Sequence, residues 1–213
     1  YLLVSQPDVG TLGSVVMIAA AVFFASGAKI SHMLFLGMGG LAALWMLIRT
    51  ESYRMDRFLV FLHPELDPRG IGYQINQALL AIGSGGLFGV GLGHSMQKFN
   101  YLPEPVGDSV FAIIGEELGF FGIMIPIALF SLIAFRGFRV ARNAPDMFGR
   151  LVAVGIVSWI IFQASINIAA ISGLAPLTGI TLPFISYGGT SIVFLLAAVG
   201  ILLNISKQAD LNS

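Results

Sequence analysis

The stretch KFNYLPEPVGDSVFAIIGEELG, residues 98–119, lies between two long apolar runs and contains groups that hydrocarbon does not tolerate. The whole chain has 213 residues with only 11 acidic and 11 basic ones, yet five ionisable side chains fall within this stretch: Lys98, Glu104, Asp108, Glu116 and Glu117. Pro103 and Pro105 restrict the backbone and remove two N–H donors, which predicts a stiff loop before the next apolar run. Because ionisable groups near the membrane interior are costly, this stretch is the first place to expect a functional site.

The composition predicts an all-α integral membrane protein. Hydrophobic residues make up 56% of the chain, charged residues 10%, and the mean hydropathy is +0.88. A soluble domain has about 45–50% apolar and about 25% charged residues. The net charge of zero argues against a nucleic-acid partner, and the lack of cysteine excludes disulfides and thiolate chemistry. The three histidines are scattered and form no metal-ligand spacing.

Six apolar segments predict about six transmembrane helices in one membrane domain, residues 1–213. A spanning helix needs roughly 20 mostly apolar residues, and the candidates are residues 10–28, 30–48, 72–92, 109–135, 151–171 and 190–205. Gly85, Gly89 and Gly93 have GxxxG spacing at the end of the third candidate and directly after it, which predicts close packing of that helix against a neighbour.

The basic residues predict the orientation. Segments 49–70 and 136–150 each contain four arginines, and two predicted helices separate them, so residues 49–71 are expected to form a cytoplasmic loop. Residues 53–62 within that loop fit either an amphipathic interfacial helix or a solvated segment. Residues 94–108 and 172–189 are then extracytoplasmic loops that lie near each other. Five arginines are expected to set the topology only: Arg54, Arg57, Arg136, Arg139 and Arg142.

Asp108 has two interpretations. An aspartate directly before an apolar run is a preferred helix N-cap, and a carboxylate at that place can also act as a general base. Glu116 and Glu117 lie further along the same helix, point in different directions as neighbours, and are expected to be structural. Gln163 and Asn167 are four residues apart and share a helix face, which predicts a hydrogen bond between helices rather than a substrate contact.

The motifs together resemble a known family. Tyr101-Leu102-Pro103-Glu104, Asp108, Phe111-Ala112 and Gly115-Glu116-Glu117-Leu118-Gly119 resemble the signature of the SEDS proteins, the FtsW/RodA/SpoVE group. Three supporting pieces occur in the family's order along nearly the whole chain: QPDVGT at 6–11, GYQ at 72–74 and LPFISYGGTS at 182–191. The chain departs from the pattern at Val106-Gly107, where the family usually has His-Thr. Members have ten membrane helices, so the resemblance implies that about four helices are missing here.

The resemblance implies a peptidoglycan glycosyltransferase that polymerises lipid II at the outer face of the bacterial cytoplasmic membrane, most like the cell-division branch. It implies Asp108 as the catalytic residue and a single inverting displacement. The substrate-binding candidates are Lys98, Tyr101, Glu104, Ser186 and Tyr187. No cofactor is certain, although Asp108 and Glu104 could hold a divalent cation, Mg²⁺ or Mn²⁺. The implied partners are a class B penicillin-binding protein transpeptidase and other membrane proteins of the divisome or elongasome.

Two other functions stay open. A flippase for the same lipid fits broken helices and intramembrane acids, but it would place those acids near the membrane midplane rather than at its edge. A non-catalytic scaffold that recruits the transpeptidase would tolerate loss of the Asp108 carboxylate.

Overall fold

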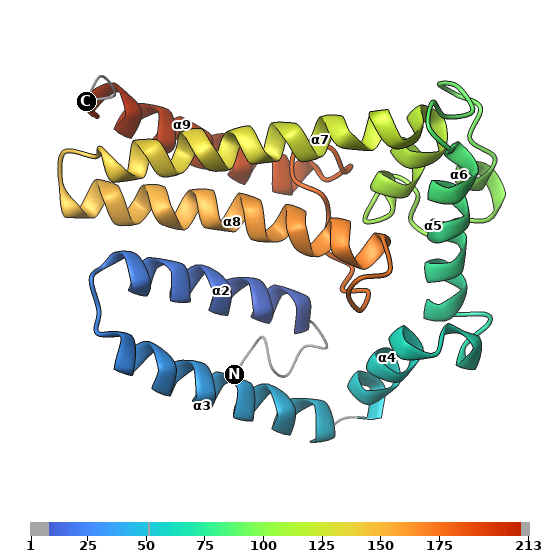
Figure 1. Ribbon diagram of the computed structural model, residues 1–213, viewed down its shortest axis with the longest axis horizontal. Coiled ribbons are helices and arrows are strands. Elements are labelled where there is room, and N and C mark those ends of the chain that lie inside the picture. Colours follow the sequence, from blue (N-terminus) through green and yellow to red (C-terminus); the bar gives the residue numbers. More distant parts are fainter. Residues whose placement is uncertain (1–8, 51, 210–213) are drawn as a thin grey trace.

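The computed structural model describes residues 9–50 and 52–209, and all regular structure in these ranges is helical (Figure 1). Residues 6–8 of the QPDVGT motif lie outside the described ranges. The elements are α2 (Val9–Ala25), α3 (Ile30–Thr50), α4 (Ser52–Leu62), the 3-10 turn η1 (Pro64–Leu66), α5 (Ile71–Gly85), α6 (Gln97–Asn100), α7 (Val110–Arg142), α8 (Met147–Ile171) and α9 (Gly189–Gln208). The predicted all-α membrane fold class is confirmed.

Five apolar helices run lengthwise in the bundle, namely α2, α3, α7, α8 and α9 (Figure 1). Helix α8 lies between α7 and α2 and packs on both. The core is formed mainly by α5, α7, α8 and α9, and it contains Phe111, Ile160 and Leu195, each about 1% exposed or less. Among the described residues, α7, α8 and α9 are long and apolar enough to cross a membrane, while α2 has only 17 residues.

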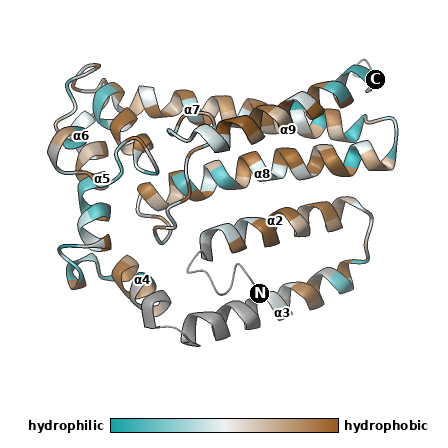
Figure 2. Ribbon diagram, turned by 180° about the vertical axis from the view of Figure 1, so that it is seen from behind, coloured by the Kyte–Doolittle hydropathy of each residue, from teal (hydrophilic) through white to brown (hydrophobic). Residues whose placement is uncertain are grey.

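Figure 2 shows that hydrophobic residues predominate in the lengthwise helices α2, α7, α8 and α9, and many of their apolar side chains are exposed. Only 22% of the most apolar part of α7 is buried, and only 11% of that of α9. Exposed side chains on these helices include Phe135, Val193 and Phe194, each more than 60% accessible. A soluble monomer rarely leaves an apolar surface of this extent uncovered, whereas lipid-facing helices require one.

The prediction of a spanning helix over residues 72–92 is wrong. Helix α5 ends at Gly85, has 15 residues, and runs across the end of the bundle rather than along it (Figure 1). At about 1.5 Å per residue it is too short to span a bilayer. Gly86 and Gly89 adopt positive φ angles of 54° and 78°, so the chain leaves the helix where the GxxxG spacing predicted it would continue.

The prediction that residues 49–71 lie at the opposite end of the bundle from residues 172–189 is also wrong. Because α5 does not cross, only the long helix α7 separates this segment from the connection between α7 and α8. The Nη1 atom of Arg57 on α4 donates to the carbonyl of Leu177 at 3.3 Å, so segment 49–71 lies at the same end as residues 172–189. Arg57 therefore makes a structural contact, beyond the topological role expected from the sequence.

Helix α7 is longer than the predicted segment 109–135 and contains a break. Its 33 residues would measure about 50 Å if straight, more than the roughly 30 Å of a bilayer core. Gly119 has φ 68° and ψ −163°, which is not helical, and the helix continues beyond it to Arg142. The loop predicted over 136–150 is reduced to the residues between Arg142 and Met147, with Asp146 capping α8 by accepting from the Gly149 amide at 3.0 Å.

The segment that follows α5 fills the break in α7. Across the break, the amides of Phe120 and Phe121 would normally donate to the carbonyls of Glu116 and Glu117. Instead, the Phe120 and Phe121 amides donate to the carbonyls of Gly86 and Leu87, at 2.9 and 3.3 Å. The Glu116 and Glu117 carbonyls accept from the amides of Val90 and Gly91, each at 3.0 Å. All four backbone groups freed by the break are thus satisfied by one inserted segment, as burial requires.

This insertion explains the glycines. A Cβ on Gly85 would lie 1.9 Å from the carbonyl oxygen of Gly115, and one on Gly89 would lie 2.1 Å from that of Glu117. A Cβ on Gly119 would lie 2.3 Å from the Gly89 nitrogen. These glycines permit close backbone contact, as expected. The contact is between the segment after α5 and the break in α7, however, and not between two straight helices.

Candidate active site

Asp108 lies in the loop before α7, half-buried, at the end of the bundle that α5 crosses. Its carboxylate accepts from the Gln74 side-chain amide, with Nε2 3.4 Å from Oδ1 and 3.5 Å from Oδ2. The Ser109 hydroxyl is 3.3 Å from Asp108 Oδ1, 3.1 Å from the Pro103 carbonyl and 3.2 Å from Gln74 Nε2. These contacts all join the carboxylate to neutral groups.

The N-cap interpretation of Asp108 is wrong. The N-cap of α7 is Ser109, with no capping hydrogen bond from its side chain. The Asp108 carboxylate instead faces α5, because the loop is tied from Ser109 to Pro103 and so directs the preceding side chain away from the helix end.

The surroundings of Asp108 favour its protonated form. Burial raises the pKa of the carboxyl above the ordinary value of an aspartate, while hydrogen bonds from Ser109 and Gln74 oppose that rise. The negative charge of Glu104 adds a smaller upward contribution to this pKa. A base whose pKa lies closer to neutral pH than that of an exposed aspartate removes a proton more effectively.

Asn167 joins the Asp108 loop to the second loop of this end. It is 2% exposed, and its Nδ2 atom donates at 2.7 Å to the carbonyls of both Asp108 and Ile180. Gln163 similarly donates to the Thr181 carbonyl at 3.0 Å. The prediction of a hydrogen bond between helices is therefore wrong for both side chains. Gln163 and Asn167 instead donate hydrogen bonds to carbonyls of loops. Irregular backbone near a membrane must find its hydrogen-bond partners within the protein.

Replacing Asn167 with leucine is expected to destabilise the protein by about 2–5 kcal/mol, because two carbonyls lose their buried donor. The free energy of unfolding in detergent micelles measures this effect. Asn204→Leu is the matched control: Asn204 lies exposed on α9, and its side chain accepts from Gln208 at 3.2 Å. Equal stabilities for the two variants would contradict this role of Asn167.

The two loops also meet through the backbone. The Tyr187 amide donates to the Val106 carbonyl at 2.8 Å, which confirms that segments 94–108 and 172–189 lie side by side. Phe184 has a positive φ of 64° in the intervening turn, an uncommon conformation for a bulky residue. The contacts of Asn167 and Tyr187 hold both loops in one arrangement around Asp108.

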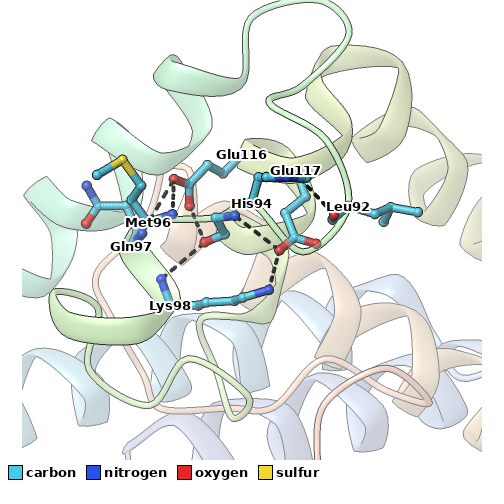
Figure 3. Close-up of polar contacts among 8 residues, drawn as sticks. Leu92, His94, Met96, Gln97, Lys98, Glu116 and Glu117 are labelled. Atoms are coloured by element: carbon cyan, nitrogen blue, oxygen red, sulfur yellow. Dashed lines mark hydrogen bonds and ion pairs between the residues drawn. The ribbon is translucent and has the colours of Figure 1, made fainter.

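Glu116 and Glu117 fasten the segment that leads into the Asp108 loop (Figure 3). The buried Glu116 carboxylate accepts from the Ser95 hydroxyl and from the Met96 amide at 3.0 Å. Glu117 accepts from the Lys98 ammonium at 2.5 Å. A structural role for both acids fits these contacts. The two carboxylates extend to different sides and meet different groups of the same segment, Ser95 and Met96 for Glu116 and Lys98 for Glu117 (Figure 3).

The substrate-binding candidates occupy different surroundings. Lys98 is half-buried and paired with Glu117. Glu104 is exposed with a positive φ of 46°, and its carbonyl accepts from the Gly107 amide at 3.0 Å. Ser186 accepts from the Leu182 amide at 2.8 Å. Tyr101 and Tyr187 are 51% and 81% exposed, so both rings are accessible at the rim of this end.

Sequence reasoning missed several polar residues at this end, chiefly Gln74, Ser95 and Ser109. Gln74 belongs to the quoted GYQ motif and stands in the polar first part of α5, with Asn76 and Gln77, before the helix becomes apolar. Polar residues at that place indicate polar partners. Ser95 and Ser109 carry no comparable local signal, because their hydroxyls matter only through residues distant in the chain.

A cavity of about 260 Å³ lies between α2, α8 and residues 178–181, next to the loop that Asn167 ties to the Asp108 backbone. Neutral polar groups of Ser14, Gln163, Thr178 and Thr181 contribute to its lining. It adjoins an apolar groove of about 570 Å³ along α2, and the two share Val15 and Ile18. The arrangement can take a molecule with a polar head and an apolar chain.

Comparison with known proteins gives consistent matches along the chain. The profile of the FtsW/RodA/SpoVE family, described as cell cycle protein, matches residues 1–211. Stage V sporulation protein E of Bacillus subtilis (strain 168) is 50% identical over 208 residues, 98% of this chain and 57% of that protein. A probable peptidoglycan glycosyltransferase FtsW of Geobacter sp. (strain M18) is 42% identical over 206 residues, 97% of this chain and 56% of the relative. These identities do not single out the division branch.

Solved structures agree with the sequence matches. A chain in the structure described as "Structural coordination of polymerization and crosslinking by a peptidoglycan synthase complex" superposes with a TM-score of 0.77 at 30% identity, over 98% of this chain and 58% of that one. A mutant of the rod shape determining protein RodA of Thermus thermophilus gives 0.63 at 29% identity, over 98% and 53%. The chain thus spans little more than half the length of the relatives it matches. From the matched motifs, the fold and these relatives, the chain belongs to the FtsW/RodA/SpoVE family of cell cycle proteins.

Proposed function

We propose that the complete protein is a peptidoglycan glycosyltransferase that polymerises lipid II into glycan strands, with Asp108 as the general base. The observation that carries this proposal is the Asp108 carboxylate: it is half-buried, and among the described residues its hydrogen-bond donors are the neutral groups of Gln74 and Ser109. A carboxylate paired with a cation would be a weaker base. Relatives named as peptidoglycan glycosyltransferases support the same reaction.

The reaction is a single displacement. The acceptor hydroxyl attacks the anomeric carbon of the donor sugar and transfers its proton to the Asp108 carboxylate. The bond from that carbon to the lipid pyrophosphate breaks, and the pyrophosphate leaves with the electron pair. The polar cavity and apolar groove beside α2 suit the two parts of a lipid-linked sugar.

The proposed substrate contacts follow from accessibility. Tyr101 and Tyr187 lie exposed at the rim and could stack on sugar rings, while Glu104 could orient sugar hydroxyls. Ser186 already accepts one backbone hydrogen bond but retains its hydroxyl proton for donation. Lys98 would have to exchange Glu117 for the pyrophosphate to contact it.

A divalent cation fits only together with the substrate. Among residues 9–50 and 52–209, no three His, Cys, Asp or Glu side chains gather at one place. Magnesium is often bound by one or two carboxylates plus substrate phosphates, so Asp108 and Glu104 would need oxygens of the lipid pyrophosphate to hold Mg²⁺ or Mn²⁺. When bound, the ion would neutralise charge on the leaving pyrophosphate.

The proposed location is the bacterial cytoplasmic membrane with Asp108 at the outer face. The opposite end of the bundle carries six of the 11 basic residues, against five at the Asp108 end, which is a small excess in the direction of a cytoplasmic side. The six are Lys29, Arg136, Arg139, Arg142, Arg150 and Lys207. The proposed partners are a class B penicillin-binding protein and other membrane proteins of the divisome or elongasome. A solved relative belongs to a peptidoglycan synthase complex, which supports an assembly of this kind.

The orientation can be tested with single cysteines, because the chain has none of its own. Tyr187→Cys is expected to react with an impermeant maleimide in intact, outer-membrane-permeable cells, since Tyr187 is exposed at the Asp108 end. Arg142→Cys, at the other end of α7, is expected to react only after the cytoplasmic membrane is opened. The reverse labelling pattern would contradict the proposed orientation.

Polymerisation of fluorescent lipid II by the complete protein, reconstituted with its transpeptidase partner, tests the function. The expected result is strand formation by the wild type and a rate at least about 10²-fold lower for Asp108→Asn. Lipid II that crosses vesicle membranes without forming strands would support the flippase instead. Strands that form equally with both proteins would leave the scaffold as the better interpretation.

A further inference from the structure

The side chain of Gln74, on helix α5, reaches the Asp108 carboxylate. It stands in the first turn of α5, and 34 positions separate it from Asp108. Its Nε2 atom lies 3.4 and 3.5 Å from the two carboxylate oxygens and 3.2 Å from the Ser109 hydroxyl. An amide group has two N–H donors, so one can serve the carboxylate and the other the serine.

The chemistry of an amide suits the orientation of a base. A glutamine neither titrates nor carries charge, so it can hold a carboxylate without neutralising it. A lysine or arginine at this place would hold the same carboxylate but would lower its basicity strongly. The neutral donor therefore restricts where the carboxylate points and leaves it able to accept a proton.

Helix α5 is itself held firmly at both ends. At its start, the Asp67 carboxylate accepts from the amides of Gly70 and Ile71, at 2.9 and 2.8 Å. At its end, Gly85 approaches Gly115 of α7 so closely that no Cβ fits between them. The donor on α5 and the loop before α7 are thus parts of one packed unit, and a rigid support of this kind makes positioning accurate.

We propose that Gln74 is a positioning residue for Asp108, holding the carboxylate in the orientation from which it takes the proton of the acceptor hydroxyl. This inference rests on the proposed function and names a further residue of the same site. The geometry that carries it is the contact of one fixed amide with both carboxylate oxygens and with the neighbouring serine.

The test compares Gln74→Met with Gln77→Met in the complete protein, with lipid II as substrate. Methionine keeps the length of glutamine but has no N–H donor. Gln77 lies one turn further on the same helix and is half-buried, while the donors described at the Asp108 carboxylate are Gln74 and Ser109. Gln74→Met is expected to lower kcat roughly 10- to 100-fold with KM changed less than about twofold, as expected for a small misplacement of a reacting group. Gln77→Met is expected to match the wild type.

Gln74→Glu is a second variant, and its side chain has nearly the same shape as the glutamine that it replaces. It places a second carboxylate against Asp108 and is expected to lower kcat at least as much as the methionine variant. Unfolding temperatures of all variants are measured beside the rates. If both Gln74 variants lose folding and activity together while Gln77→Met does not, Gln74 is only structural and the inference is overturned.

The remaining outcomes separate this inference from the proposed function. If Asp108→Asn makes no strands and Gln74→Met polymerises at the wild-type rate, only the positioning role fails. A rise in KM at unchanged kcat would make Gln74 a substrate-binding residue and would likewise overturn the inference. If the wild type makes no strands, or Asp108→Asn makes them normally, the proposed function fails and the role of Gln74 fails with it.

Discussion

Replacing Asp108 with asparagine is expected to lower the rate of glycan polymerisation by about 10²- to 10⁴-fold, the contribution of a positioned general base. Asparagine keeps the size of the side chain and an oxygen that can accept from Gln74 and Ser109. It cannot take up the proton of the acceptor hydroxyl. The loss is therefore expected in kcat, with little change in lipid II binding or stability. Strand length and amount from labelled lipid II are the measurement.

Asp146→Asn is the matched control for this substitution. Asp146 caps α8 at the other end of the bundle, and asparagine caps helices about as well as aspartate. This variant should polymerise at the wild-type rate. An Asp108→Asn protein as active as the control would exclude Asp108 as the base.

The pH dependence of the wild type gives a second check on Asp108. Its carboxylate works as a base only when ionised, so the rate should fall about tenfold per pH unit below its pKa. Because burial raises that pKa, the fall should begin at higher pH than it would for an exposed aspartate. The residual rate of Asp108→Asn should lack this acidic limb. Polymerisation rates measured between about pH 4 and 8 at constant ionic strength test whether the pKa of Asp108 is raised.

Replacing Gly119 with alanine is expected to cost more than about 4 kcal/mol of stability, an exceptionally large effect for one methyl group. Its φ of 68° with ψ of −163° falls in a region that only glycine occupies readily. The new Cβ would also lie 2.3 Å from the Gly89 nitrogen, a backbone atom that cannot move aside without breaking the inserted segment. The amides of Val90 and Gly91 should then lose their protection from hydrogen exchange.

Gly83→Ala is the control for Gly119→Ala. Gly83 lies within α5, and a Cβ there meets nothing within 4 Å. Alanine should leave the stability unchanged or raise it by up to about 1 kcal/mol, because it restricts the unfolded chain. If Gly119→Ala unfolds at the same temperature as Gly83→Ala, the insertion of residues 86–91 does not hold α7 together.

The helical membrane fold was predictable from the amino-acid order, and so was the polar stretch that forms the candidate site. Runs of apolar residues near 20 in length indicate spanning helices whatever their neighbours are, because the bilayer acts on each segment separately. The helices α8 and α9 therefore appear close to their predicted positions. The polar stretch around Asp108 was recognisable for the same reason, since its charges interrupt two apolar runs.

The path of residues 71–119 was decided by tertiary contacts. Gly85 and Gly89 fit a straight packed helix as well as a turn, and their sequence contains no preference between the two. The choice depends on carbonyls of Gly115, Glu116 and Glu117, which lie about 30 positions away in the chain. The contact of Gln74 with Asp108 and the burial of Glu116 arise from the same folding of α5 across the bundle. Hydropathy and local propensity carry no information on such pairings, because they form only when the distant backbone is already in place.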